Sequence, residues 1–280
     1  MKESLSLVDL VIQIVDARAP LMSRNPKLLQ WLNHRPHIVL ANKADLASPA
    51  GNRQWRRWFE EHDEPVDFVE AWRLRNPVPL AERWKALIEQ KRKERGATRP
   101  LLRPFRVMIV GIPNIGKSTL INHLKSRNVT KVGPKPGVTR QNQWVTIAAG
   151  LELLDTPGIL WPSLRDPVQE QMLTLLGNIP DEAGDPVRTA SFLIRRLAML
   201  GIPAPWDKLD LTGDFTEPEE ALEALAVRRG MLLPGGVPSI TVAAQAFLKD
   251  YRSGRLGRWT LENIPAPGET AAAAPEEGEE

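Results

Sequence analysis

One stretch of the sequence limits the fold more than any other. A run of mostly apolar residues, Phe105–Val110, leads into Gly111-Ile-Pro-Asn-Ile-Gly-Lys-Ser118, and a helix-forming pattern follows over Lys117–Ser126. A hydrophobic strand, a G-x-x-x-x-G-K-[ST] loop and a helix, in this order, make up a phosphate-binding loop. Its glycines let backbone N–H groups turn toward phosphate oxygens, and the start of the helix favours an anion. The sequence therefore predicts a phosphate-binding α/β domain built around this strand.

The polar groups of this loop have expected roles toward a nucleotide. We expect Lys117 to contact the β- and γ-phosphates and to stabilise the charge that develops there, and the Ser118 hydroxyl to bind Mg²⁺. The residues assigned to contacts with the nucleotide phosphates are Asn114, Ile115, Gly116, Lys117, Ser118 and Thr119.

A second motif lies thirty-seven residues after the phosphate-loop serine, where Asp155 ends an apolar run and begins Asp-Thr-Pro-Gly158. At this distance from the loop we expect Asp155 to bind Mg²⁺ through water and the Gly158 N–H to contact the γ-phosphate. The loop between the two motifs contains Thr139, which we expect to be the second hydroxyl ligand of Mg²⁺. Lys117, Thr139 and Gly158 are therefore the groups expected to stabilise a transition state.

A third motif, Asn42-Lys43-Ala-Asp45, follows the apolar run His37–Ala41. An Asp carboxylate can accept two hydrogen bonds, from N1–H and from the 2-amino group of guanine. Adenine lacks this pair of donors and would leave the carboxylate unpaired, so such a site discriminates strongly. We expect Asn42 to position the base and its loop, and the stem of Lys43 to lie along the ring. The three motifs together predict a guanine nucleotide.

Apolar runs rich in Val and Ile alternate with helical patterns over the first part of the chain, which is typical of parallel βα units. Strands are expected near Val8–Val15, His37–Ala41, Val66–Val69, Phe105–Val110, Trp144–Ala148 and Leu151–Leu154. Helices are expected over Asn25–Asn33, Ala50–His62, Leu80–Arg95, Lys117–Ser126, Pro167–Leu176, Pro186–Leu200, Pro218–Arg229 and Ser239–Tyr251. The expected organisation is an α/β domain with a mostly parallel sheet (1–165), a small all-α domain (166–262) and a disordered acidic tail (263–280).

The order of the motifs is unusual, because N-K-x-D precedes the phosphate loop by about 70 residues. In Ras-like GTPases the phosphate loop comes first and N-K-x-D lies near the end. The sequence resembles the circularly permuted GTPases of ribosome biogenesis, and most closely the ribosome biogenesis GTPase A family of bacteria and mitochondria. The resemblance extends over roughly residues 5–260, and the segments that carry it are Val15–Pro20, Ser23–Pro26, Lys135–Thr139, Gln143–Val145, Asp155–Pro162 and Gly254–Arg258.

The resemblance implies a circularly permuted Ras-like P-loop GTPase domain that slowly hydrolyses GTP to GDP and phosphate, with Mg²⁺ as cofactor. It implies a role in assembly of the large ribosomal subunit, with the subunit precursor and its rRNA as partners. It also implies that Asn114 can hold K⁺ beside the phosphates, and that the loop containing Ala71 offers its N–H to the guanine oxygen. We expect a cytoplasmic protein that is monomeric in solution.

The sequence departs from that pattern near the expected base and γ-phosphate. Glu70 and Trp72 are atypical neighbours of Ala71. Ile159 follows the Asp-Thr-Pro-Gly motif where Ras-like enzymes place a water-orienting Gln, and this apolar residue is a trait of the family. A candidate catalytic His in the family's N-terminal F-P-G-H segment has no counterpart here. We therefore identify no general base, and expect ordinary surface or packing roles for His34, His37, His62 and His123.

Charge and composition narrow the class of partner. The chain has no cysteine, which excludes disulfides, thiolate metal sites and a Cys nucleophile. No apolar run approaches the roughly 18 residues of a membrane span. Residues 1–177 hold 27 Lys and Arg against 17 Asp and Glu, net +10, whereas residues 178–280 hold 10 against 17, net −7. A basic first part favours a polyanionic partner.

The basic charge is densest between Arg83 and Arg106, with nine Lys and Arg against two Glu. This stretch is a candidate contact with the RNA backbone, and a solvated helix face is the alternative. Other functions also stay open: a permuted GTPase acting on the small subunit, or a catalytically idle, GTP-gated RNA-binding scaffold. A metabolic P-loop kinase would have no use for N-K-x-D.

Overall fold

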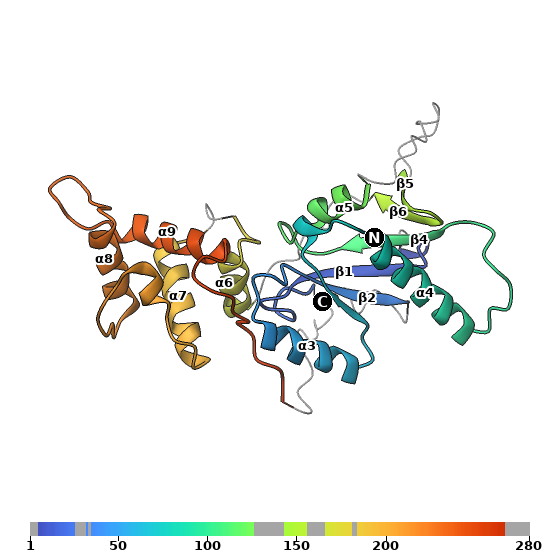
Figure 1. Ribbon diagram of the computed structural model, residues 1–280, viewed down its shortest axis with the longest axis horizontal. Coiled ribbons are helices and arrows are strands. Elements are labelled where there is room, and N and C mark those ends of the chain that lie inside the picture. Colours follow the sequence, from blue (N-terminus) through green and yellow to red (C-terminus); the bar gives the residue numbers. More distant parts are fainter. Residues whose placement is uncertain are drawn as a thin grey trace, which may run out of the picture.

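A computed structural model describes residues 5–25, 32, 35–125, 143–155, 166–180 and 184–266, without the side chains of Gln143 and Asp155. Over these residues the chain forms a six-stranded sheet with helices on both faces, and a group of helices beside it (Figure 1). The strand order is β3-β2-β1-β4-β6-β5, so the strand that precedes the phosphate loop, β4, lies inside the sheet. This confirms the α/β class, with helices following the sheet.

The strands fall within two residues of the ranges expected from the sequence. They are β1 (Leu10–Asp16), β2 (His37–Asn42), β3 (Val66–Phe68), β4 (Phe105–Val110), β5 (Gln143–Ala148) and β6 (Leu151–Asp155). All neighbours pair in parallel except β5, which is antiparallel to β6. The turn between these two strands has only two residues, Ala149 and Gly150, and Gly150 has φ +73°. So short a connection reverses the chain and can join only antiparallel strands.

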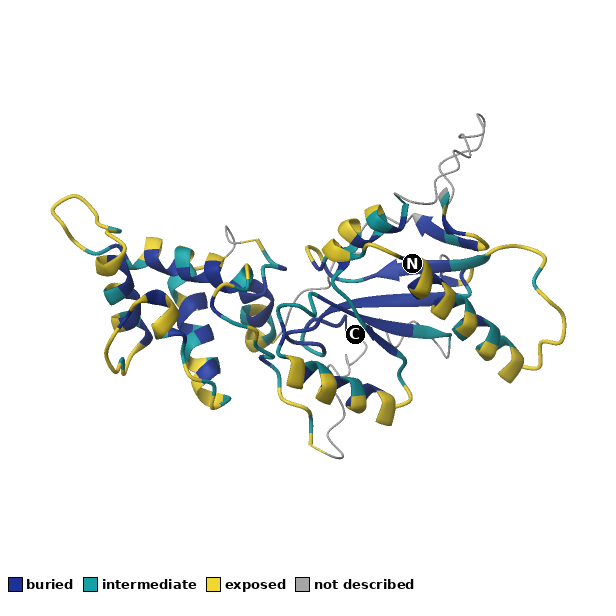
Figure 2. Ribbon diagram, in the orientation of Figure 1, coloured by how far each residue is buried: buried dark blue, intermediate teal, exposed yellow. Residues whose placement is uncertain are grey.

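Helices cover both faces of the sheet, which explains why its strands are apolar on both sides (Figure 2). Helices α4 (Val78–Glu94) and α5 (Lys117–Lys125) pack on one face. Helix α3 (Pro49–Glu61) covers the other, and places Trp55 and Phe59 in its core. The helix expected over Asn25–Asn33 lies almost entirely outside the described residues.

The remaining helices form a second core after the sheet. They are α6 (Pro167–Leu175), α7 (Pro186–Met199), α8 (Pro218–Arg228) and α9 (Ile240–Arg252). The carboxylates of Asp166 and Asp185 cap α6 and α7, and a proline follows each cap, as helix starts favour. Leucines of all four helices enclose Phe247 and Tyr251. No helix among the described residues is long and apolar enough to cross a membrane.

The chain leaves the helical core after α9 and returns to the sheet-containing part. Residues 255–262, here called the C-terminal strap, hydrogen-bond to the loops that follow β1 and β2. The Leu261 N–H donates to the Arg18 carbonyl at 2.7 Å, and the Trp259 N–H donates to the Leu46 carbonyl at 3.1 Å. The Glu262 carboxylate accepts from the N–H groups of Leu21 (2.7 Å) and Met22 (3.0 Å). The last residues of the expected all-α domain (166–262) therefore pack on the first part.

Candidate nucleotide-binding site

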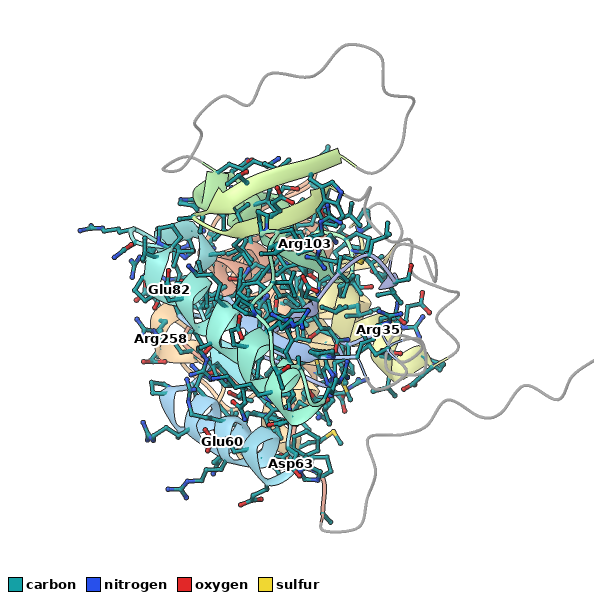
Figure 3. The ribbon with its side chains drawn as sticks, turned by 90° about the vertical axis from the view of Figure 1, so that its right-hand side faces the viewer. Arg35, Glu60, Asp63, Glu82, Arg103 and Arg258 are labelled. Atoms are coloured by element: carbon teal, nitrogen blue, oxygen red, sulfur yellow. The ribbon has the colours of Figure 1, made fainter. Side chains whose placement is uncertain are left out.

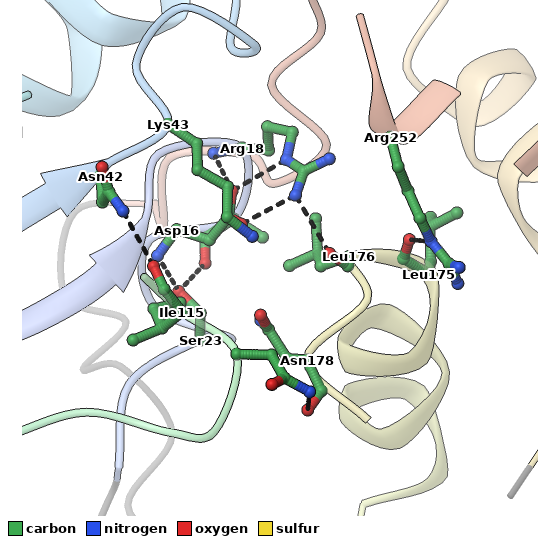
Figure 4. Close-up of polar contacts among 12 residues, drawn as sticks. Asp16, Arg18, Ser23, Asn42, Lys43, Ile115, Leu175, Leu176, Asn178 and Arg252 are labelled. Carbon is green, nitrogen blue, oxygen red and sulfur yellow. Dashed lines mark hydrogen bonds and ion pairs between the residues drawn. The ribbon is translucent and has the colours of Figure 1, made fainter. Parts of the chain in front are cut away.

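The phosphate loop and the N-K-x-D motif meet because of the direction of the strands. In a parallel sheet the carboxyl ends of neighbouring strands lie at one edge, where α/β proteins bind ligands. Strands β1, β2 and β4 are parallel neighbours, and Asp16 lies opposite Asn42 in the register of the first two. The phosphate loop, the N-K-x-D loop and the end of β1 therefore meet at this edge (Figure 4).

The phosphate loop has the tight backbone that its glycines predict. A Cβ on Gly111 would lie 2.9 Å from the Ile14 carbonyl oxygen. Gly116 has φ +105°, and a Cβ there would clash with Nδ2 of Asn42. No other residue fits at Gly116, because both its conformation and its neighbour exclude a side chain.

Lys117 opens helix α5 and folds back over this loop. Its Nζ donates to the carbonyls of Gly111 (2.6 Å) and Ile112 (2.8 Å), and burial lowers the pKa of the ammonium group. The ammonium group thus lies on the loop beside the N-terminus of α5. A helix N-terminus and a cation suit a phosphate group, so the residues present fit a nucleotide.

Asn42 links three loops through one side-chain amide. Its Nδ2 donates to the Ile115 carbonyl of the phosphate loop at 2.9 Å. Its Oδ1 accepts from the N–H of Ala71, in the loop that follows β3, at 3.0 Å. Asn42 is 4% exposed, so neither hydrogen bond has water as a ready substitute. The expected role of Asn42 in holding the loops has a direct structural counterpart.

The Ala71 N–H, which is expected to face guanine, has a partner within the protein. We expected the Ala71 N–H to face a guanine oxygen, but here it donates to Asn42 Oδ1. The N–H of the next residue, Trp72, makes no hydrogen bond to any residue that the structure describes. The side chain of Trp72 donates from Nε1 to Asp45 Oδ2 at 3.0 Å, while Asp45 Oδ1 is enclosed and accepts none within the described part of the chain.

Lys43 takes part in a buried charge cluster at the end of β1. Its Nζ lies 3.1 Å from Asp16 Oδ2, and Arg18 binds both oxygens of that carboxylate, at 2.9 and 2.8 Å. Burial alone would raise the pKa of Asp16, but Arg18 and Lys43 together hold it well below its usual range. Motif reasoning assigned no role to Asp16 or Arg18, although a D-x-R pattern directly after a buried strand is a usable signal.

Arg18 continues this cluster into the helical part. Its Nη2 donates to the Leu176 carbonyl at the end of α6 at 3.2 Å, and its guanidinium lies 5.3 Å from the ring centre of Tyr251 in α9. The phosphate loop has a similar contact, since Asn114 Nδ2 approaches the Asn178 carbonyl at 3.4 Å. Both sides of the candidate site therefore touch the segment that follows α6.

The remaining expected groups are tested less fully. Thr139 and Gly158 lie outside the described residues. Asp155 is the last residue of β6, and nothing is described of its side chain. Ser118 lies in the first turn of α5, one residue after Lys117. Of the expected Mg²⁺ ligands, the structure therefore places Ser118, in the first turn of α5, and the backbone of Asp155, at the end of β6.

A parallel sheet with this edge, and N-K-x-D before the phosphate loop, define a circularly permuted P-loop GTPase. A family model described as "50S ribosome-binding GTPase" matches residues 106–183. The chain belongs to the ribosome biogenesis GTPase A family. It is 35% identical over 267 residues to the protein of that name from Bacillus cereus, a match covering 95% of this chain and 90% of the relative. The Thermotoga maritima protein of the same name is 30% identical over 262 residues, covering 94% and 88%.

Solved structures agree with this assignment. GNP-bound YlqF from T. maritima matches with a TM-score of 0.64 and 27% identity, covering 93% of this chain and 95% of that one. A GDP-bound structure of YlqF matches with a TM-score of 0.66 and 27% identity, covering 93% and 97%.

The mouse mitochondrial ribosome-associated GTPase 1 is 31% identical over 288 residues, covering 95% of this chain and 87% of the relative. The chain is a GTPase, as its motifs predicted.

Proposed function

We propose that this chain binds GTP with Mg²⁺ at the carboxyl edge of its sheet, hydrolyses it to GDP and phosphate, and acts in assembly of the large ribosomal subunit. One observation carries the nucleotide site: Asn42 of N-K-x-D hydrogen-bonds to Ile115 of the phosphate loop, 73 residues further along the chain. The ribosomal role is supported by the names of the relatives and by the description of the matching family model.

Each side chain of the site has a proposed task. The N–H groups of 114–119 and the ammonium group of Lys117 bind the phosphates, while Asn42, Lys43 and Asp45 bind the guanine. The donor set for Mg²⁺ is Ser118 and Thr139 directly and Asp155 through water, all of them the oxygen ligands that this ion prefers. Asn114 is the proposed K⁺ ligand.

Catalysis in such a site depends on positioning and charge stabilisation. Lys117, Thr139 and the Gly158 N–H are proposed to stabilise charge on the transferred phosphoryl group, and Mg²⁺ would neutralise part of it when bound. No general base is assigned, and Ile159 offers no hydrogen bond to water. We therefore expect a low intrinsic rate.

The proposed partner is the large-subunit precursor with its rRNA. The protein is proposed to act in the cytoplasm as a monomer. The basic stretch 83–106 has less free positive charge for this contact than its sequence suggests. Several of its cations are already paired with carboxylates, among them Arg83 with Asp67, Lys85 with Glu82 and Arg103 with Asp9. Glu82 and Arg103 both lie at the surface (Figure 3). Surface pairs of this kind reduce the net charge that RNA phosphates would meet.

Phosphate release from GTP tests the proposal. We expect slow release by the full chain with Mg²⁺ and K⁺, and faster release with large-subunit particles than with small-subunit particles. Lys117→Ala, which removes the phosphate-loop cation, is the matched inactive variant. Acceleration by the small subunit alone would favour the rival GTPase function. Release no faster than with Lys117→Ala, together with GTP-dependent particle binding, would favour the idle scaffold.

A further inference from the structure

The side chain of Trp72 contacts the residue on which guanine recognition depends in the proposed function. Its indole Nε1 donates to Asp45 Oδ2 at 3.0 Å, across 27 residues of sequence. Trp72 is 54% exposed, which is unusual for a tryptophan that serves only in packing. A large aromatic group is therefore held at the surface beside the N-K-x-D carboxylate.

Two further contacts surround the Trp72 loop. The Arg73 guanidinium lies 4.3 Å from the centre of the Trp72 ring, at cation–π distance. Arg73 is in turn paired with Glu70 at 3.5 Å. Directly before Trp72, the Ala71 N–H is bound by the buried amide of Asn42. The loop is thus anchored on the same residue that anchors the phosphate loop.

The hydrogen-bond capacity of Asp45 leaves room for a ligand. An ionised carboxylate has about four acceptor positions, and an indole N–H uses one of them. Asp45 Oδ1 is enclosed and accepts no hydrogen bond from a described residue. Oδ1 has no exposed surface in this structure, so the atoms that cover it must move before guanine can bind. With Trp72 donating to Oδ2, each carboxylate oxygen then keeps a free acceptor position for one of the two donors of the guanine edge.

We propose that Trp72 is a positioning residue for guanine specificity: its indole N–H holds the Asp45 carboxylate in the orientation that accepts both donors of guanine. An indole N–H can only donate, so it cannot accept the guanine N–H groups that Asp45 is proposed to bind. The inference rests on the proposed function and names a residue that acts through Asp45 on the choice of base.

The test compares nucleotides that differ by one donor. GDP offers N1–H and a 2-amino group to Asp45, whereas inosine diphosphate offers N1–H alone. Trp72→Phe keeps an aromatic ring under Arg73 and removes the N–H. We expect GDP affinity to fall on the order of tenfold, as for loss of one hydrogen bond to a charged group, and inosine diphosphate affinity to fall less. The ratio of the two affinities, measured by calorimetry on the full chain, therefore narrows.

Trp144→Phe is the matched control, because Arg106 lies over the Trp144 ring at the same 4.3 Å without any contact to Asp45. It should leave the ratio unchanged. An equal fall of both affinities in Trp72→Phe would reduce Trp72 to a structural anchor, and a rise of both would make it a barrier to binding. Either result overturns the proposal.

Two further arms separate this inference from the function on which it rests. If the wild-type chain binds ADP as well as GDP, the guanine site itself is wrong, whatever Trp72 does. In Asp45→Ala, which removes the acceptor of the Trp72 indole N–H, adding Trp72→Phe should change GDP affinity no further. A full additive loss in the double variant would contradict the action of Trp72 through Asp45.

Discussion

At the scale of single residues, Asn42 does the most to assemble the site. A buried amide has two donors and an acceptor, and here its nitrogen serves the phosphate loop while its oxygen serves the loop after β3. The same amide lies where a Cβ of residue 116 would be, so Asn42 leaves room only for glycine at that position. Base recognition and phosphate binding thus share one side chain.

Replacing Asn42 with Ala should both destabilise the fold and weaken nucleotide binding. The change leaves the Ile115 carbonyl and the Ala71 N–H without this partner in a buried region, at a cost of about 1–3 kcal/mol for each unsatisfied group. Urea unfolding and GDP titration measure the two effects. Gln13→Ala is the control, because its buried amide accepts from Arg24 at 3.2 and 3.0 Å and bonds to no described residue of the phosphate loop or of N-K-x-D. Equal losses of GDP affinity in the two variants would contradict a linking role.

At the scale of elements, Arg18 contacts the end of helix α6 and helix α9 from the loop after β1, while a buried ion pair with Asp16 holds it. Arg18 is 1% exposed and satisfies the Asp16 carboxylate with two parallel hydrogen bonds. A buried pair of this kind adds little over an apolar replacement, but breaking it strands a charge. Burial favours the neutral form of Arg18, but Asp16 outweighs it and holds the pKa of Arg18 above its usual range, so the pair stays ionised.

Arg18→Ala should therefore cost about 3 kcal/mol of unfolding free energy, toward the lower end for a broken buried pair because Lys43 still neutralises Asp16 in part. The double variant Asp16→Leu with Arg18→Met removes both charges and should be less destabilised than Arg18→Ala. Chemical denaturation of both variants provides the comparison. A loss below about 1 kcal/mol for Arg18→Ala would show that the pair contributes little to joining β1 and the helices.

At the scale of the whole molecule, the C-terminal strap connects the helical core to the loops that follow β1 and β2. Glu262 binds two N–H groups next to the end of the β1 loop, 240 and 241 residues away in sequence. Burial raises the pKa of its carboxyl group to about 7, although these N–H groups, Arg196 and Arg24 act in the opposite direction. This attachment is therefore sensitive to pH in the neutral range.

The sign of that pH dependence follows from proton linkage. The ordinary pKa of this carboxyl group is 4.5, so between about pH 4.5 and 7 the folded chain binds more protons at Glu262 than the unfolded chain. Its stabilising contribution is complete below about 4.5 and is lost as the pH rises through about 7. We expect the unfolding free energy to fall by about 1–3 kcal/mol over this pH range. Glu262→Gln should remove this dependence on pH. An equal change in unfolding free energy between pH 5 and pH 7.5 in the wild type and in Glu262→Gln would contradict this.

The contacts between the two parts also predict coupling between nucleotide state and partner. Asn114 of the phosphate loop and Arg18 both touch residues that follow α6, so a change at the phosphates can bias the helical part. Coupling of this kind is typically about 1–3 kcal/mol, or about 5- to 150-fold in affinity. A non-hydrolysable GTP analogue should raise affinity for large-subunit particles over GDP by a factor in that range. Identical co-sedimentation in both nucleotides, at several salt concentrations, would contradict the coupling.

The sequence alone determined the features whose causes are local. Apolar runs specified the strands of the sheet, and the order strand, G-x-x-x-x-G-K-S, helix specified a phosphate loop whose Gly116 has the positive φ that only glycine adopts readily. Asn42 and Asp45 were identified by the donors that a guanine edge offers. In each case a few neighbouring residues contain the whole physical reason.

Only the tertiary structure decided which groups meet. Asn42 reaches Ile115, and Arg18 reaches Leu176 across 158 residues, because parallel strands bring their carboxyl ends to one edge beside α6. The Ala71 N–H donates to Asn42, at the end of β2, because the pairing of β2 with β3 brings the loop after β3 beside it. Hydrogen bonds between loops depend on such distances, and no pattern along the chain contains them.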